Sequence, residues 1–210
     1  MSPRRYQMSR RAAAAQQTRT RIITAARQLL AVKTGRRSFS VDAVAKQAGV
    51  ARMTVYYQFH SKTGLLEALY DSLAVQSGLD DLSEAFRKPD PLQALLEFIG
   101  IFIRFWSSDR VVIRRLRALS ALDPEIAGAL QAREVRRRQA LQTILARVKE
   151  QYGHPTARKL QEAVDILHML TSFESFDHLT GATRKVNEVG DTVMRLALAT
   201  VVLYGAPIGE

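Results

Sequence analysis

Cysteine is absent from this 210-residue chain, and so is any hydrophobic run long enough to cross a membrane. The lack of cysteine excludes disulfides, thiolate metal sites and thiol redox sensing, and it suits a reducing compartment. The most apolar stretch, residues 196–204, is far shorter than the roughly 20 residues that a membrane span requires. The basic N-terminus is not followed by an apolar segment of the kind found in secretory signals. We therefore expect a soluble, cytoplasmic protein without a membrane partner.

Acidic residues are scarce in one part of the chain only. The first 62 residues contain thirteen Lys and Arg but a single acid, Asp42, whereas the remaining 148 contain eighteen bases and nineteen acids. The formal net charge of +11 therefore comes entirely from the N-terminal region. A basic N-terminal region (residues 1–62, here called the head) followed by a nearly neutral remainder (residues 63–210, the body) is typical of a protein that binds a polyanion. A head that is basic only for solubility would not need to exclude acids, so we expect nucleic acid as the partner.

Apolar residues recur at helical spacing through nearly the whole sequence, which predicts an all-α fold of about nine helices. Gly35 is expected to end the first helix, and Ser61 to cap the fourth. We expect two domains: a basic arm with a helix-turn-helix DNA-binding domain at 1–62, and a helical ligand-binding and dimerisation domain at 63–210. Polar and helix-breaking residues make 78–90 the best candidate boundary inside the body. The expected helices are 12–33, 41–48, 52–59, 62–77, 91–107, 110–119, 124–152, 156–179 and 184–204.

The segment 41–59 has the residue pattern of two short helices that cross at a tight turn. Such a pair needs a small residue where the backbones approach, a left-handed residue at the turn and apolar residues pointing inward. Ala45, Gly49 and Val55 stand at these places, and Ser40 can cap the first of the two helices. A helical hairpin in any bundle shows parts of this pattern, and the basic surroundings favour the DNA-binding version.

From Arg21 to Leu69 the sequence resembles the DNA-binding domain of TetR-type transcriptional regulators. The resemblance is carried by RIITAARQLL, SVDAVA and AGVARMTVYYQFHSKTGLLEAL, and the segment YYQFHSK contains the family's Tyr-x-x-Phe-x-x-Lys signature. It implies that the helix 52–59 enters the major groove. The sequence departs from the family at Ala51, where a capping side chain is common, at Met53, where glycine is common, and at Thr63-Gly64, where an acid is common.

Eight residues are expected to contact DNA. Thr54, Tyr56 and Lys62 have side chains that can bind phosphates. Ser40, as an N-cap, can leave backbone amides free for a phosphate. The full set is Ser40, Arg52, Met53, Thr54, Tyr56, Tyr57, Gln58 and Lys62.

Base recognition would come from the other members of this set. Met53 and Tyr57 can touch thymine methyl groups. Arg52 can read guanine or clamp a phosphate, and Gln58 can read adenine or bind a phosphate, so both roles stay open. The arm with Arg4, Arg5, Arg10 and Arg11 can reach the minor groove or remain a disordered tail, and we favour the tail.

The body is expected to form a homodimer through its last two helices, which are apolar nearly all round. The alternative is that both are central helices of a monomer. An aromatic-rich helix at 91–107 can line a cavity for a small apolar or amphipathic effector, although ordinary core packing would use the same residues. The candidate ligand-binding residues are Phe98, Phe102, Trp106, His168, Met169, Phe173 and Phe176. No metal and no cofactor is expected.

These features together predict a sequence-specific DNA-binding regulator. We expect it to be a repressor that a small-molecule effector releases from its operator. One alternative is an architectural DNA-binding protein without an effector. A second is a protein that uses its basic head on membrane surfaces. An enzyme is not expected, since no catalytic triad, paired carboxylates, phosphate loop or metal-ligand cluster stands out.

Overall fold

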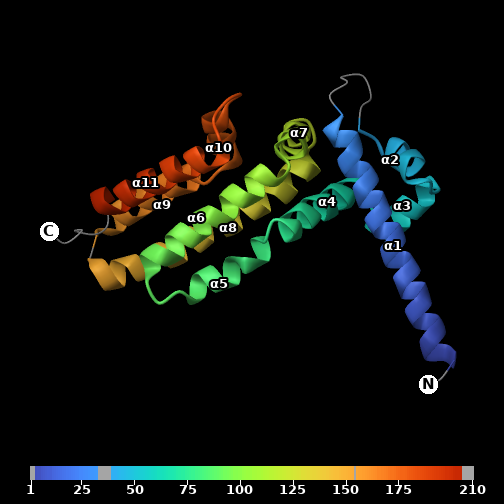
Figure 1. The fold of residues 1–210 in the computed structure, drawn as a ribbon, viewed down its shortest axis with the longest axis horizontal. Coiled ribbons are helices and arrows are strands. Elements are labelled where there is room, and N and C mark those ends of the chain that lie inside the picture. The colour runs from blue at the N-terminus through green and yellow to red at the C-terminus, as the bar shows by residue number, and fades with distance from the viewer. Residues whose placement is uncertain (1–2, 33–38, 154, 205–210) are drawn as a thin grey trace. The chain divides into compact units, whose positions relative to one another are not determined.

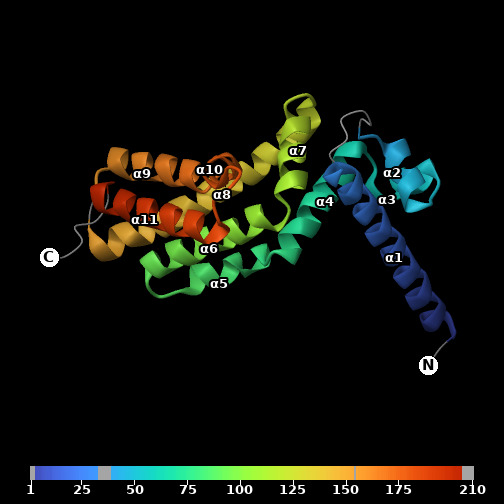
Figure 2. The ribbon, with the colours of Figure 1, turned by 45° about the horizontal axis from the view of Figure 1, so that its top comes forward.

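The computed structural model describes residues 3–32, 39–153 and 155–204, and all regular structure within these ranges is helical. The all-α prediction is therefore confirmed. Within the same ranges no helix combines the length and apolarity needed to cross a bilayer. Figures 1 and 2 show the elements from two sides. In order they are α1 (Pro3–Ala31), α2 (Val41–Ala48), α3 (Arg52–Phe59), α4 (Lys62–Gln76), the 3-10 helix η1 (Leu79–Asp81), α5 (Leu82–Arg87), α6 (Pro91–Ser108), α7 (Arg110–Ser120), α8 (Pro124–Tyr152), α9 (Ala157–Leu170), α10 (Phe173–Thr180) and α11 (Val186–Tyr204).

The described ranges contain eleven α-helices, whereas the sequence predicts about nine. One addition is α5, which with η1 lies in the segment 78–90, where the sequence predicts a boundary and no helix. Ala85 of α5 is fully buried, and α5 packs against α6. Tertiary burial of one side of this segment outweighs its polar, helix-breaking composition.

The second addition arises because the helix predicted at 156–179 is broken into α9 and α10. The Nε1–H of Trp106 donates to the carbonyl of Thr171 at 2.9 Å. The N–H of Ser175, which would otherwise bond that carbonyl in a continuous helix, bonds the Ser172 hydroxyl at 3.1 Å instead. Ser172 thereby becomes the N-cap of α10.

Helix α1 begins at Pro3, before its expected start, so the backbone around Arg4, Arg5, Arg10 and Arg11 continues the helix. Gly35, predicted to end this helix, lies outside the described residues. The turn at Gly49 is confirmed: the residue is left-handed, with φ 63° and ψ 42°. Its N–H bonds the carbonyl of Lys46 at 3.3 Å, which closes α2.

The chain divides into two compact units. The first contains Met1–Ser72 and Val111–Ala129, and the second contains Leu73–Arg110 and Leu130–Glu210. The first unit therefore holds most of α7 and residues 124–129 of α8 in addition to the helix-turn-helix. The predicted boundary after residue 62 stays a prediction, because a compact unit need not be an independently folding domain. The core of the first unit includes Ile22, Ala26, Leu30, Val44, Ala45, Val55, Phe59, Leu65, Leu69, Val112, Ile113 and Leu116.

In the second unit, α6 packs against α5, α10 and α11, and α9 runs beside α11 in both views (Figures 1 and 2). Aromatic rings of α6 stack along the helix: the centroids of Phe98 and Phe102 are 4.8 Å apart, and those of Phe105 and Trp106 are 4.6 Å apart. The Trp106 ring also meets Phe173 of α10 edge-on at 5.6 Å. The aromatic helix is therefore central to the core of this unit.

A buried arginine lies beside this aromatic core. Arg137 of α8 is 5% exposed, and its guanidinium donates to the His168 carbonyl and to the Thr171 hydroxyl, both at 2.6 Å. It also pairs with the carboxylate of Glu134 and lies 5.7 Å from the ring centroid of Phe102. These contacts tie α8 to α6 and to the break between α9 and α10.

Arg137→Ala is expected to lower the free energy of unfolding by about 3 kcal/mol, because it removes the buried hydrogen bonds to the His168 carbonyl and the Thr171 hydroxyl and the ion pair with Glu134. Urea denaturation followed by circular dichroism measures the effect. Arg136→Ala removes the exposed neighbouring charge and should change stability by less than about 0.5 kcal/mol. Equal stability of the two variants would contradict the structural role of Arg137.

Candidate nucleic-acid interface

Helix α3 has a buried side and an apolar exposed side. Val55 and Phe59 point inward and are 1% and 4% exposed. Met53 and Tyr57, four residues apart and therefore on one face, are 72% and 83% exposed. Together with Thr54 and Tyr56 they line an open hollow of about 480 Å³. The structure thus brings four of the eight predicted DNA-contacting residues to a single exposed surface.

The two helix starts at this surface differ in their capping. Ser40 is the N-cap of α2, and its hydroxyl accepts from the Ala43 N–H at 3.2 Å, as predicted. Ala51 precedes α3 and makes no side-chain cap, which confirms that this position forfeits one. Helix α3 must therefore be held mainly by contacts along its length and at its other end.

Arg52, the first residue of α3, forms contacts on both sides of its guanidinium. Nη1 lies 3.3 Å from a carboxylate oxygen of Asp42, and Nη2 donates to the Tyr56 hydroxyl at 3.3 Å. The hydrogen bond to Tyr56 and then the charge of Asp42 raise the pKa of Arg52 above its ordinary value. The side chain is therefore a permanent cation held in place at the edge of the exposed surface.

The far end of α3 is held by Arg19 of α1, which the sequence analysis did not single out. Its Nη1 donates to the Gln58 carbonyl at 2.9 Å, and its guanidinium carbon lies 4.4 Å from the ring centroid of Phe59. A cation at a helix C-terminus also interacts favourably with the helix dipole. The signal was present in the sequence: Arg19 stands three residues before Ile22, on the inward stripe of the first helix.

The turn from α3 into α4 is unusually tight. His60 is the one non-glycine residue with positive φ in the described chain, at φ 64° and ψ −38°, and the Ser61 N–H bonds the Phe59 carbonyl at 2.7 Å. This is a strained γ-turn. The Ser61 hydroxyl accepts from the Gly64 N–H at 2.9 Å, as expected of a helix cap. A Cβ at Gly64 would lie 2.2 Å from the Phe59 oxygen, so glycine is required by this close approach.

Lys62 and Thr63, just after this turn, contact the start of α8. The Lys62 ammonium lies 3.6 Å from a carboxylate oxygen of Asp123, and the Thr63 hydroxyl donates to Glu125 at 3.1 Å. Lys62, which the sequence predicts to bind a phosphate, therefore has a carboxylate as its neighbour. All four residues belong to the first compact unit.

The candidate effector-binding residues lie in the second unit. Phe98, Phe102, Trp106, Phe173 and Phe176 are buried, whereas Met169 is 57% exposed and lies outside the buried cluster.

His168 lies beside the same cluster. Its Nε2 lies 3.2 Å from the Glu134 carbonyl. Burial and the charge of Arg137 lower the pKa of His168, which favours a neutral ring at neutral pH.

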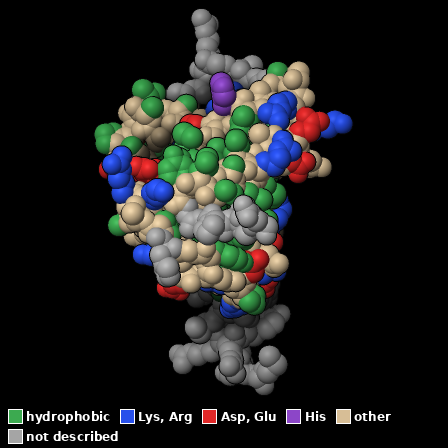
Figure 3. Space-filling view, turned by 90° about the vertical axis from the view of Figure 1, so that its left-hand side faces the viewer, with side chains coloured by type: hydrophobic (Ala, Val, Ile, Leu, Met, Phe, Trp, Pro, Cys, Tyr) green, Lys and Arg blue, Asp and Glu red, His purple; other side chains and the backbone are tan. Residues whose placement is uncertain are grey.

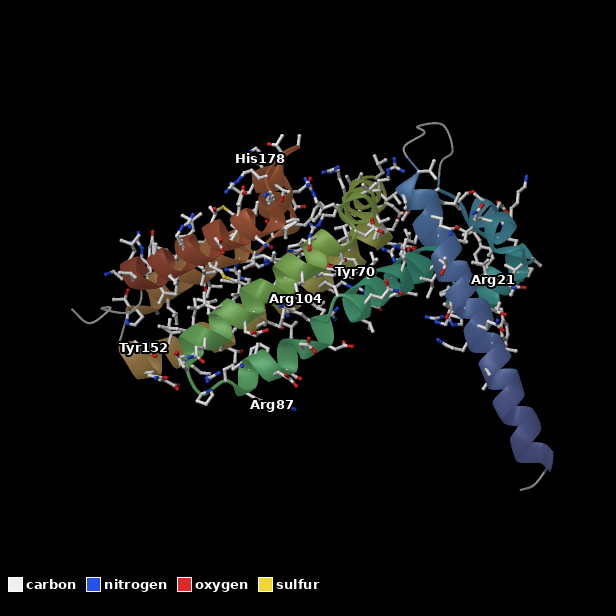
Figure 4. All side chains as sticks on the ribbon, viewed as in Figure 1. Arg21, Tyr70, Arg87, Arg104, Tyr152 and His178 are labelled. Carbon is white, nitrogen blue, oxygen red and sulfur yellow. The ribbon has the colours of Figure 1, made fainter. Side chains whose placement is uncertain are left out.

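Arg19→Ala should lower the free energy of unfolding of the first unit by about 1–2 kcal/mol, because a partly buried hydrogen bond and a cation–π contact are both lost. Thermal unfolding of the full chain measures the effect. Arg21→Ala is the matched control, since Arg21 is an exposed arginine on the same helix (Figure 4). A melting temperature of the Arg19 variant equal to that of the control would show that Arg19 does not hold α3.

Comparisons with known proteins agree with this geometry. The family model described as bacterial regulatory proteins of the tetR family matches residues 22–69. The transcriptional regulator EthR of Mycolicibacterium smegmatis is 36% identical over 95 residues, which are 44% of this chain and 43% of that relative's length.

The fold is shared over nearly the whole chain. A TetR transcription regulator from Haloarcula marismortui matches with a TM-score of 0.69 at 14% identity, covering 90% of this chain and 99% of its own. A transcriptional regulator from Saccharomonospora viridis, solved in complex with choline, matches with a TM-score of 0.66 at 17% identity, covering 91% and 98%. The tetR family model therefore matches the helix-turn-helix segment, and the fold is similar to that of solved TetR regulators over about nine tenths of the chain.

Proposed function

We propose that this protein binds a specific double-stranded operator by placing α3 in the major groove and thereby regulates transcription. The observation that carries the proposal is the exposed apolar face of α3. Met53 and Tyr57 are 72% and 83% exposed on a helix whose opposite side is buried, in a region of the chain that contains thirteen bases and one acid. Apolar contacts to thymine methyl groups account for this face, and the surrounding charge accounts for affinity to the phosphate backbone.

The remaining contacts follow from the position of each side chain. Thr54 and Tyr56 line the same hollow and have hydroxyls that can donate to phosphates. Gln58, on the last turn of α3, has its carbonyl occupied by Arg19 but keeps its side-chain amide for a base or a phosphate. The N-terminal turn of α2, capped by Ser40, is suited to a phosphate.

The protein is proposed to act as a homodimer, because one helix-turn-helix contacts only one half-site and two heads about 34–36 Å apart read a palindrome. The last two helices of the body, 156–179 and 184–204 as predicted, are the proposed interface. Apolar side chains on α11 support this choice, since Leu196 and Leu203 are 45% and 72% exposed. Figure 3 shows hydrophobic side chains gathered on one face of the second unit. Exposed apolar patches of this kind mark association surfaces.

Release from the operator by a small apolar or amphipathic effector is the proposed regulatory step, which makes the protein a repressor acting in the cytoplasm. The buried aromatic cluster of α6 and α10 supports such a ligand chemically. The related fold from Saccharomonospora viridis was solved with choline, a small amphipathic cation.

The test is fluorescence anisotropy of the full chain with DNA from upstream of its own coding region and with a scrambled duplex, from about 50 to 300 mM salt. Tight binding to one duplex and weak binding to the other, with a steep salt dependence for both, is the expected result. Equal, salt-sensitive affinity for the two would favour an architectural DNA-binding protein. Absence of binding to either duplex at low salt would overturn the proposal.

The Lys62–Asp123 pair leads to a second expected result. Asp123→Asn should tighten DNA binding by roughly three- to tenfold at about 100 mM salt, because a carboxylate that competes with phosphate for Lys62 is removed. The asparagine keeps the side-chain oxygen that caps α8 through the Glu125 N–H at 3.2 Å. Glu150→Gln makes the same charge change on an exposed residue of the second unit and should have a smaller effect. An unchanged affinity in the Asp123 variant would show that Lys62 does not contact DNA.

A further inference from the structure

Asp42 is the single acid among the first 62 residues, and the structure places it against the first residue of α3. Its position in the first turn of α2 by itself explains only a favourable interaction with the helix dipole. The carboxylate also lies 3.3 Å from Nη1 of Arg52, across the turn that separates the two helices. Side chains of Asp42 and Arg52 are 63% and 58% exposed, so the pair lies on the open surface.

An exposed pair of this kind adds little to stability, because solvent screens both charges. It also has a cost for DNA binding, since a carboxylate beside the recognition helix repels phosphates. The contact with Arg52 therefore adds little to folding beyond the favourable interaction of Asp42 with the dipole of α2. What the contact does change is the freedom of the Arg52 side chain.

Arg52 is restrained from two directions. Asp42 holds Nη1, while the Tyr56 hydroxyl accepts from Nη2 at 3.3 Å and the Tyr56 ring lies 5.5 Å from the guanidinium carbon. A guanidinium has five N–H groups, so one N–H on each terminal nitrogen and the Nε N–H remain free. Two parallel donors are what guanine requires, because its O6 and N7 accept side by side in the major groove.

We propose that Asp42 is a positioning residue that presents Arg52 to a guanine, and that these two residues set one position of the operator. The inference rests on the proposed function, namely that α3 reads the major groove. It resolves the two roles that the sequence leaves open for Arg52 in favour of base recognition. An unrestrained arginine would bind the nearest phosphate. An arginine that Asp42 partly neutralises and Tyr56 orients gains most from guanine, which accepts two hydrogen bonds side by side.

The experiment is a selection of binding sites from a random pool of double-stranded DNA of about 30 base pairs, followed by sequencing. The full-length wild type, Asp42→Asn, Asp42→Glu, Arg52→Ala and the double variant Asp42→Asn/Arg52→Ala are compared. Anisotropy with the selected duplex and with a copy that lacks the guanine then gives a specificity ratio for each protein. Circular dichroism confirms that every variant is folded.

The expected results distinguish a role of Asp42 in positioning Arg52 from an effect of its negative charge alone. Asp42→Asn should raise affinity for the guanine-free duplex by about two- to threefold, since a negative charge is lost, while its specificity ratio falls by roughly three- to tenfold. Asp42→Glu should keep most of the ratio. Arg52→Ala should abolish the guanine preference, and adding Asp42→Asn to it should change the ratio no further, as coupled residues require.

Two outcomes overturn the inference, and they differ from each other. If Asp42→Asn changes affinity for both duplexes equally, or if the selected guanine persists in Arg52→Ala, Asp42 acts only through its charge and the positioning role is wrong. If the wild type enriches no sequence at all, the proposed operator binding itself fails. The behaviour of the wild type therefore tells the two failures apart.

Discussion

The exposed side of α3 depends on the attachment of a helix that is too short to be stable alone. Helix α3 has eight residues and no side-chain cap at its start, and isolated helices of that length are marginal in water. Burial of Val55 and Phe59 supplies apolar contact along one side. Arg19 holds the last turn through the Gln58 carbonyl, and the close approach at Gly64 fixes where the chain enters α4. All of these contacts lie on the inner side of α3 or at its end.

Because contacts on its inner side and at its C-terminus hold α3, the side chains on its outer side are not needed to keep the helix in place. Met53 and Tyr57 can therefore remain exposed without loss of the fold, and their chemistry can be matched to a partner. On the outer side, Arg52 contacts Asp42 and Tyr56. These contacts are too exposed to matter much for stability, so their effect is on the orientation of a side chain rather than on folding.

The second unit combines a large aromatic core with a few buried polar ties. Trp106 and Arg137 both bond residues at the break between α9 and α10, so the position of that break depends on α6 and α8. Aromatic rings packed at centroid distances near 5 Å leave little freedom for independent movement. Under the proposed function, an effector that enters this cluster must shift these rings, and the polar ties would then carry the change into α8 and α9.

The sequence by itself determined the helical class, the limits of α2, α3 and α8, the left-handed turn at Gly49 and the concentration of positive charge in the head. These features depend on apolar spacing, capping residues and composition, which act over a few neighbouring residues. Only the tertiary structure decided that α9 ends at Leu170, that Lys62 lies beside Asp123 and that Asp42 contacts Arg52. Each of these depends on a side chain from another helix. The spacing of residues within one helix does not determine which side chain of another helix will lie beside it.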